Sequence, residues 1–270
     1  VHYSLDGIEF SSNGATSFEK SNLYYWHSLS VQNEARYILV TANSQFLKIL
    51  EIGFFETKDA ASTIEIKNIF SSNPDKNGGK ALFDEQELVP KEGATYMNSM
   101  YFDEIYHART AYESANGLSI YEWTHPPLGK DFISWSISAL GMTPFAWRLA
   151  GTMAGVLMIP AMFFLALLMF RKTSWATVAA LFMALDGMHF VQTRIATIDS
   201  FGVLFIILMF LFMYWYYSIS FYDTPLLKTF IPLGLCGLSF GLGAASKWIC
   251  LYGGAGLAVI AGIGPGVGQG

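Results

Sequence analysis

The sequence predicts a multi-pass α-helical membrane protein that carries an antiparallel β-sandwich module at its N-terminal end. Hydrophobic residues occupy 53% of the 270 positions and charged residues only 14%, whereas a soluble domain is charged at about a quarter of its positions. Residues 1–130 hold 27 of the 37 charged side chains, with 10 Lys/Arg against 17 Asp/Glu and a net charge of -7. Residues 131–270 hold only 10, with a net charge of +2. This division excludes a single soluble domain, and the lack of a basic face excludes a nucleic-acid-binding protein.

The β-sandwich module is expected over residues 1–70, on the extracytoplasmic side. Residues 22–66 are rich in Val, Ile, Tyr, Phe and Thr, with Asn, Ser, Gly or Asp in the gaps, as is typical of short strands in an antiparallel sandwich. The polar residues 71–98 are expected to form a linker, and residues 99–144 an external loop with surface helices. The expected strands are Tyr24–Val31, Arg36–Thr41, Lys48–Phe55 and Ser62–Ile66.

Transmembrane helices are expected over residues 145–264, because nearly charge-free runs here are long enough to cross a hydrocarbon core of about 30 Å. Arg171 and Lys172 lie between the first two runs, and Lys228 lies between the third and the fourth. The positive-inside rule places these links in the cytoplasm and the acidic front of the chain outside. The runs are 149–170, 174–191, 200–220 and 230–247, with a candidate fifth at 248–264.

Two further features bound the chemistry of the chain. The only cysteines, Cys236 and Cys250, lie in apolar runs, so we expect neither a disulfide framework nor a clustered thiol metal site. The chain starts at Val1 and ends in the Gly-rich run Gly262–Gly270, so we expect an internal fragment of a longer membrane protein.

The densest polar cluster near the membrane is YFDEIYHA, Tyr101–Ala108. On a helix, Asp103 and His107 share one face, and Glu104 lies about 100° round from Asp103. An aspartate near a membrane surface and close to a histidine is suited to act as a general base for a hydroxyl. The alternative is an ordinary surface helix with solvated charges.

A second cluster is WTHPPLGK, Trp123–Lys130. The two prolines that follow His125 favour an extended segment and then a helix start. We expect Asp131–Leu140 to continue as an amphipathic helix on the membrane surface. The alternative is a rigid turn that only anchors the loop.

Single cations stand at the outer ends of two expected spans. Arg148, in PFAWRL, lies at the mouth of the first span, and Lys247, in ASKW, lies at the end of the fourth. A guanidinium offers a planar fork of donors that suits a phosphate. The alternative for both residues is a snorkelling side chain at the membrane interface.

The link between the second and third spans is bracketed by Asp186, Arg194 and Asp199. Acidic side chains at membrane depth are costly, so they are candidates for function. The alternative is a structural ion pair between Arg194 and Asp199.

Taken together, these motifs resemble the protein O-mannosyltransferase family, which is glycosyltransferase family 39 with the GT-C membrane fold. The order is FDE-x-x-H-A, THPPLGK, PFAWRL, R-x-A-x-x-D-S and GLxxGLxxASKW, and it runs from about Tyr101 to Tyr252. Bacterial relatives of this family are often labelled phospholipid carrier-dependent glycosyltransferases. Separately, Ala35–Glu56 resembles the closing strands of discoidin-like (galactose-binding-like) jelly-roll domains.

The resemblance implies inverting transfer of a sugar, typically mannose, from a polyprenyl-phosphate carrier to a hydroxyl of a protein Ser/Thr on the extracytoplasmic face of the cell membrane. It implies that Asp103 and Glu104 are catalytic and that Arg148, with Lys247, holds the carrier phosphate. The donor is a lipid-linked sugar, so we assign no cofactor and no metal. The residues implied to shape the site or the acceptor are His107, His125, Arg194 and Asp199.

One departure from the family leaves the acceptor open. Members of the family have a short stretch between the first membrane helix and the acidic pair, whereas residues 1–98 precede the pair here. We interpret these residues as an insertion in the first external loop, which would select a glycan, a lipid or a wall polymer. The alternatives are a lipid-linked-sugar transferase acting on a lipid or a cell-wall polysaccharide, and a non-enzymatic glycan-binding or transport protein. A transporter would usually show broken helices or repeated halves.

Overall fold

The protein is described by a computed structural model that divides into two compact units, Val1–Met100 and Tyr101–Gly270. In the first unit, the described residues are 1–12, 14–17, 25–30, 34–41, 49–56, 63–72, 79–84, 86, 89–90 and 93–100. In the second unit, they are 101–219 and 223–263.

The first unit contains a three-stranded antiparallel sheet in the order β2-β1-β3. Its strands are β1 (His2–Ser4), β2 (Ser11–Ser12) and β3 (Tyr37–Leu39). The turn between β1 and β2 is fixed by Asp6, whose Oδ1 accepts the backbone N–H groups of Ile8 (2.8 Å) and Glu9 (3.1 Å). A short 3-10 helix, Lys80–Leu82, lies later in the unit.

The sandwich expected in this unit stays a prediction. Of the four expected strands, only Arg36–Thr41 contains a strand, and the described parts of the other three, 25–30, 49–55 and 63–66, are in no strand. Residues 24, 31, 48 and 62 lie outside the described residues. Isolated backbone hydrogen bonds take the place of a ladder here, from Ile52 N to Leu82 O and from Ile64 N to Phe54 O, both 2.8 Å.

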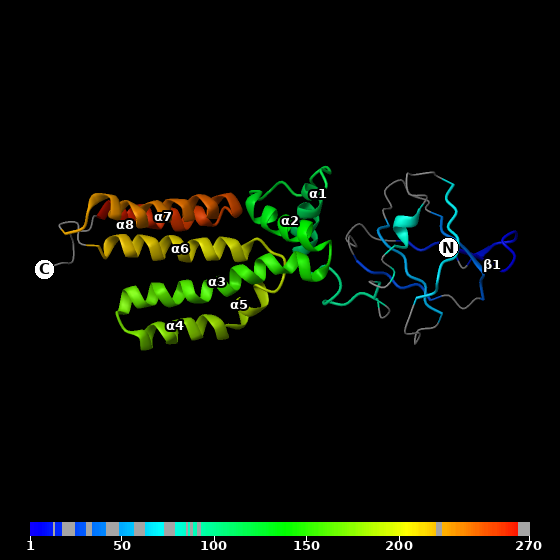
Figure 1. Ribbon diagram of the computed structural model, residues 1–270, viewed down its shortest axis with the longest axis horizontal. Helices are drawn as coiled ribbons and strands as arrows, with labels where there is room; N and C mark the ends of the chain where they lie inside the picture. Colours follow the sequence, from blue (N-terminus) through cyan, green and yellow to red (C-terminus); the bar gives the residue numbers. More distant parts are fainter. Residues whose placement is uncertain are drawn as a thin grey trace. The chain divides into compact units, whose positions relative to one another are not determined.

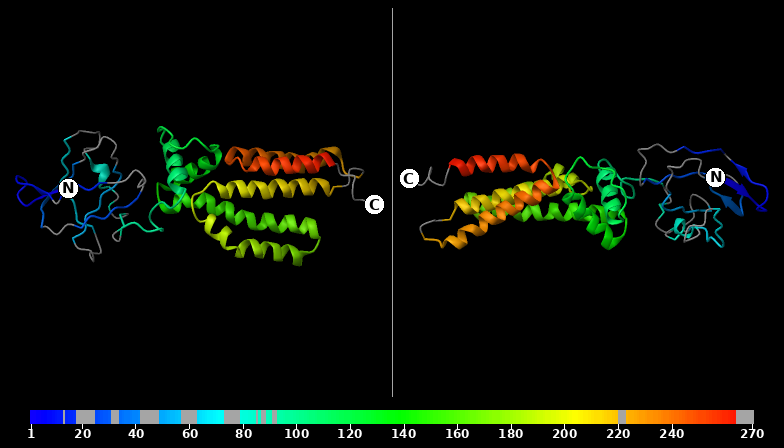
Figure 2. Two further views of the ribbon diagram at one scale, coloured as in Figure 1. Left: turned by 180° about the vertical axis from the view of Figure 1, so that it is seen from behind. Right: turned by 90° about the horizontal axis from the view of Figure 1, so that it is seen from above.

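The second unit is helical (Figure 1). Helices α3, α4, α6, α7 and α8 run side by side, and α1 and α2 lie across one end of this bundle (Figures 1 and 2). The helices are α1 (Glu104–Ala115), α2 (Leu128–Leu140), α3 (Pro144–Phe170), α4 (Thr173–Leu185), α5 (Gly187–Gln192), α6 (Asp199–Tyr217), α7 (Leu226–Ser246) and α8 (Cys250–Ile263).

In the described part of the chain, three helices are long and apolar enough to cross a membrane: α3, α6 and α7. They correspond to the expected runs at 149–170, 200–220 and 230–247. The run expected at 174–191 is divided into α4 and α5, because Asp186 has an extended backbone and its side chain caps α5 by accepting the N–H of His189 at 2.7 Å. The candidate fifth run is the shorter helix α8.

Helix α3 begins earlier than the apolar run indicates. The Thr143 side chain accepts the N–H of Ala146 at 3.2 Å, and Pro144 occupies the first helical position, where proline costs no hydrogen bond. Arg148 therefore lies within α3 rather than before it, and the helix fixes its position.

The core between the membrane helices is apolar, and α6 lies at its centre. A buried cluster of Met209, Met213, Cys236, Cys250 and Leu257 joins α6, α7 and α8. Both cysteines are free thiols. The bundle is therefore a rigid support for the polar groups at its α1–α2 end.

Candidate functional site

The helices that carry the candidate residues meet at one end of the bundle, where α1 and α2 lie near the N-terminal ends of α3 and α6 and the C-terminal end of α7 (Figure 1). Arg171 and Lys172 lie at the opposite end of α3, in its link to α4. The polar end includes Asp103, Glu104, His107, Glu122, His125, Lys130, Arg148, Arg194, Asp199 and Lys247.

The centre of the site is an ion pair between Glu104 and Arg148. Glu104 is 0% exposed. Its two oxygens accept from the Arg148 guanidinium, Nε to Oε1 and Nη2 to Oε2, both at 2.8 Å. The backbone N–H of Ala196 donates to Oε1 at 2.9 Å, and that of Tyr101 donates to Oε2 at 2.8 Å. A buried carboxylate that accepts four hydrogen bonds, two of them from one bidentate arginine, is well compensated for its desolvation.

This ion pair ties together three segments that are far apart in the sequence. Glu104 begins α1, Arg148 belongs to α3, and Ala196 lies in the link before α6. Because the fork of Arg148 is directed at Glu104, the structure gives both residues a role in holding the site together. The roles expected from the resemblance, in catalysis for Glu104 and in phosphate binding for Arg148, stay predictions.

Asp103 differs sharply from its neighbour. It is the N-cap residue of α1, yet its side chain makes no capping hydrogen bond. Among the residues that the structure describes, its carboxylate forms no hydrogen bond or ion pair. Its backbone is αR, with φ -70° and ψ -6°, whereas a capping aspartate has an extended backbone.

The residue before Asp103 explains this conformation. Phe102 has a left-handed backbone with φ 54°, which costs a non-glycine residue about 1–3 kcal/mol. Such strain persists where the surrounding structure imposes it, and it gathers at functional sites. The strained turn leaves the Asp103 carboxylate without a backbone donor among the residues that the structure describes.

Two histidines face each other beside the acidic pair. The rings of His107 and His125 stack with centroids 5.8 Å apart. Burial lowers the pKa of His107 to about 4, so the ring is neutral at neutral pH. Within the described residues, neither Nδ1 atom has a hydrogen-bond partner. His107 therefore contributes shape and a neutral ring rather than charge.

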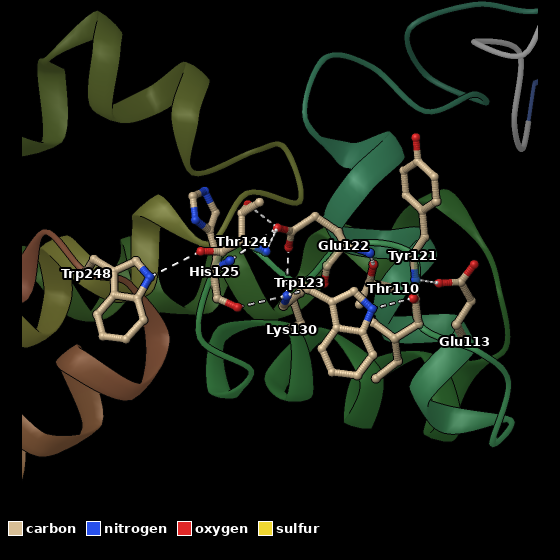
Figure 3. Close-up of polar contacts among 10 residues, drawn as sticks. Thr110, Glu113, Tyr121, Glu122, Trp123, Thr124, His125, Lys130 and Trp248 are labelled. Carbon is tan, nitrogen blue, oxygen red and sulfur yellow. Dashed lines mark hydrogen bonds and ion pairs between the residues drawn. The ribbon is translucent and has the colours of Figure 1, made fainter.

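An ion pair between Glu122 and Lys130 lies in the loop that carries His125 (Figure 3). Burial raises the pKa of Glu122, but hydrogen bonds from Lys130 and Thr124 outweigh it and lower the pKa to about 2. Neither residue is among the site residues expected from the sequence. The sequence does show an acidic residue and a lysine on either side of a His-Pro-Pro turn. Charged residues in a loop are usually solvated, so this pattern alone does not predict an ion pair.

Lys247 and Asp199 form an ion pair at the ends of α7 and α6. The alternative pairing of Asp199 with Arg194 is wrong. Asp199 is the first residue of α6 and pairs with Lys247 at the end of α7. The Arg194 guanidinium instead lies over the ring of Phe190, 4.8 Å from its centroid. Arg194 is exposed, and within the described residues it has no carboxylate partner.

The arrangement combines a carboxylate that has no partner among the described residues with cations near the ends of α3 and α7. Asp103 is suited to accept a proton, and Arg148 and Lys247 are suited to offset negative charge. Among the described residues, no group of three or more His, Cys, Asp or Glu side chains is arranged to hold a metal ion.

Comparison with known proteins connects this end of the bundle to a family. Residues 138–263 match the family described as dolichyl-phosphate-mannose-protein mannosyltransferase. Arg148, Arg194, Asp199 and Lys247 lie inside the matched stretch, whereas Asp103 precedes it.

Similar proteins include two that are named polyprenol-phosphate-mannose–protein mannosyltransferase. The one from Mycobacterium tuberculosis is 28% identical over 115 residues, covering 40% of this chain and 22% of the relative. The one from Mycolicibacterium smegmatis is 28% identical over 134 residues, covering 50% of this chain and 23% of the relative. The chain thus spans about a fifth of the length of these relatives. No solved structure matches it.

The family match covers α3 to α8 and the end of α2, and this stretch contains the three apolar helices that are long enough to cross a membrane. This part of the chain is therefore similar to the dolichyl-phosphate-mannose-protein mannosyltransferase family.

Proposed function

We propose that the full-length protein is a membrane mannosyltransferase that moves mannose from a polyprenyl-phosphate carrier to a protein Ser/Thr hydroxyl on the extracytoplasmic face. The observation that carries the proposal is the carboxylate of Asp103, which has no hydrogen-bond or ion-pair partner in the described part of the chain. It lies next to the Glu104–Arg148 pair, which joins α1 to the helices that match the family. A site built to move a proton at the membrane surface needs such a carboxylate.

The proposed reaction is a single displacement with inversion. The acceptor oxygen attacks the anomeric carbon while the Asp103 carboxylate takes its proton. The bond between the anomeric carbon and the phosphate oxygen breaks, and the lipid phosphate leaves with the electron pair. Because the donor is already activated by its phosphate, positioning and base catalysis supply the protein's share, and we assign no further cofactor.

Lys247 and Arg148 are the proposed partners of the lipid phosphate. Lys247 ends α7, where its ammonium is shared with Asp199, and Arg148 lies in the first part of α3. Cations at these positions offset the charge that grows on the departing phosphate. Compensation of this charge stabilises the transition state, so loss of either cation should lower kcat as well as the affinity for the donor.

The orientation of the bundle leads to a topology prediction. The ends of the bundle are marked by Thr173, next to Arg171 and Lys172, and by Ser119, in the loop after α1; both marker residues are exposed. In intact cells, a cysteine at Ser119→Cys should react with an impermeant maleimide, and one at Thr173→Cys should react only after permeabilisation. The two native cysteines are buried, so the parent protein is the control. Labelling of Thr173→Cys alone would place the site in the cytoplasm.

The activity itself is tested with membranes that contain the full-length protein. Radiolabelled polyprenyl-phosphate-mannose is supplied with a Ser/Thr-rich acceptor peptide, a lipid acceptor or a polysaccharide acceptor, and transfer to each is measured. The proposal expects label on the peptide. Transfer to the lipid or polysaccharide alone would keep the enzyme class and change the acceptor, and no consumption of donor would reject the proposed function.

The first unit is proposed to help select the acceptor. This rests on the resemblance of Ala35–Glu56 to discoidin-like modules with a sandwich fold, part of which, 42–48, lies outside the described residues. Removal of residues 1–98 from the full-length protein should then change the preference among the acceptors above more than it changes the consumption of donor.

A further inference from the structure

We infer that Glu122 and Lys130 act together as positioning residues, forming a clasp that fixes the distance between the Asp103 side of the site and the Lys247 side. The inference rests on the proposed function and extends it, because neither residue is assigned a role above. The clasp is defined as the ion pair of these two side chains and the loop 122–130 that it closes.

The first observation is the complete use of the Lys130 ammonium inside the loop. Lys130 is only 4% exposed. Its Nζ donates to Glu122 Oε2 at 2.7 Å, to the Glu122 carbonyl at 3.0 Å and to the His125 carbonyl at 3.1 Å. An ammonium has three protons, and all of them are used here by two residues of the same loop. Removal of this group would leave three partly buried acceptors without this donor.

The second observation is that Glu122 holds the other side of the same loop. Its Oε1 accepts the backbone N–H of Thr124 at 2.6 Å and that of His125 at 3.2 Å, and it also accepts the Thr124 hydroxyl. One carboxylate therefore binds both backbone amides before the prolines, while its second oxygen binds Lys130. The loop conformation is fixed by side chains because prolines cannot supply backbone donors.

The third observation is that the clasped loop contacts both sides of the site. On one side, the ring of His125 stacks on His107, which lies one helical turn beyond Asp103. On the other side, the carbonyl of Thr124 accepts the indole Nε1–H of Trp248 at 3.2 Å, across 124 positions of sequence (Figure 3). Trp248 directly follows Lys247, so this hydrogen bond ties the end of α7 to the loop.

The close packing of α2 against the end of α7 supports the same role. A side chain at Gly129 would come within 2.9 Å of Ile198 Cγ2 and 3.3 Å of the Ser246 carbonyl. Gly129 and Lys130 are adjacent, so the clasp and this close approach hold one end of α2 against α7. The loop thus works as a spacer between the proposed base and the proposed phosphate partner.

The test combines a spectroscopic signal with donor kinetics, on full-length protein labelled with 5-fluorotryptophan. The fluorine resonance of Trp248 is assigned by its loss in Trp248→Phe. Lys130→Met should shift and broaden this resonance, because Thr124 no longer holds the indole in one place, and the resonance of Trp215, in α6 far from the loop, should not move. Lys228→Met, which removes an exposed lysine at the start of α7, is the matched control.

The kinetic arm asks whether the clasp acts through Trp248. Loss of hydrogen bonds from a charged donor should lower kcat/KM for the donor about 10–100-fold in Lys130→Met, and loss of the neutral indole bond should lower it about 2–10-fold in Trp248→Phe. The double variant should be no worse than Lys130→Met alone, because the two changes break one connection. Effects that multiply in the double variant would overturn the inference.

The spectroscopic arm stands even where the proposed function fails. If the protein transfers no mannose, the Trp248 resonance still reports whether the clasp holds the end of α7. An unchanged resonance in Lys130→Met overturns the inference with or without activity. If Lys130→Met does not fold, Glu122→Gln, which keeps the shape of the side chain, must move the same resonance in the same direction.

Discussion

Asp103→Asn is expected to reduce mannosyl turnover by about 10²–10⁴-fold while the protein stays folded and still binds its donor. Asparagine keeps the size and hydrogen-bonding shape of the side chain but cannot accept a proton at neutral pH. The Asp103 carboxylate has no partner among the described residues, so its replacement breaks no contact there. The measurement is kcat for mannosyl transfer together with the dissociation constant of the donor.

The competing interpretation makes Asp103 a helix-capping charge. Asp186 is the matched control, because it is also an N-cap residue and its side chain does accept a backbone N–H, that of His189 at 2.7 Å. Asparagine caps a helix about as well as aspartate does, so Asp186→Asn should cost no more than about 1 kcal/mol of stability and leave turnover intact. If Asp103→Asn behaves in the same way, the base is another residue, and Asp199 would be the next acid to test.

The helical bundle was predictable from the sequence because the signal for an apolar helix is local. The runs at 149–170, 200–220 and 230–247 have counterparts in α3, α6 and α7. Where the observed helices differ from the expected runs in their bounds, the sequence does carry a local signal, but a weak one. Thr143 and Pro144 mark the true start of α3, and Asp186 followed by Gly187 marks the division of the second run.

The first unit was harder to predict, because its strands are short and polar. β2 consists of Ser11 and Ser12, and both are exposed. Such a strand has no alternation of apolar and polar residues, so its pairing with β1 leaves no pattern to find. β3, inside Arg36–Thr41, carries both an aromatic residue, Tyr37, and a β-branched one, Ile38, which favour a strand.

The residue types at the site were predictable, but their pairing was not. Glu104 pairs with Arg148 across 44 positions and with the amide of Ala196 across 92. Asp199 pairs with Lys247, 48 positions away, rather than with the nearby Arg194. A single sequence shows which side chains can carry charge, but the packing of helices decides which charges meet.

The Glu104–Arg148 pair gives Glu104 a structural role that its neighbour Asp103 does not share. The second large expected effect is therefore a loss of stability when Glu104 is replaced. Glu104→Gln should destabilise the helical unit by about 3–5 kcal/mol, because it removes the carboxylate charge from a buried ion pair with Arg148. The amide nitrogen of glutamine would also face donors, since both carboxylate oxygens of Glu104 accept two hydrogen bonds each. Thermal unfolding of the protein in detergent measures this loss.

The control and the double variant separate charge from hydrogen bonding. Asp131→Asn changes an acid in the first turn of α2 that has no ion pair within the described part of the chain, and it should cost less than about 1 kcal/mol. In Glu104→Gln/Arg148→Met, the guanidinium charge of Arg148 is removed as well, so part of the lost stability should return. The remainder should reflect the amides of Tyr101 and Ala196, at about 1–3 kcal/mol for each one left unsatisfied. If Glu104→Gln instead keeps full stability and loses turnover as Asp103→Asn does, then Glu104 acts on the substrate, and the ion pair with Arg148 forms only when no donor is bound.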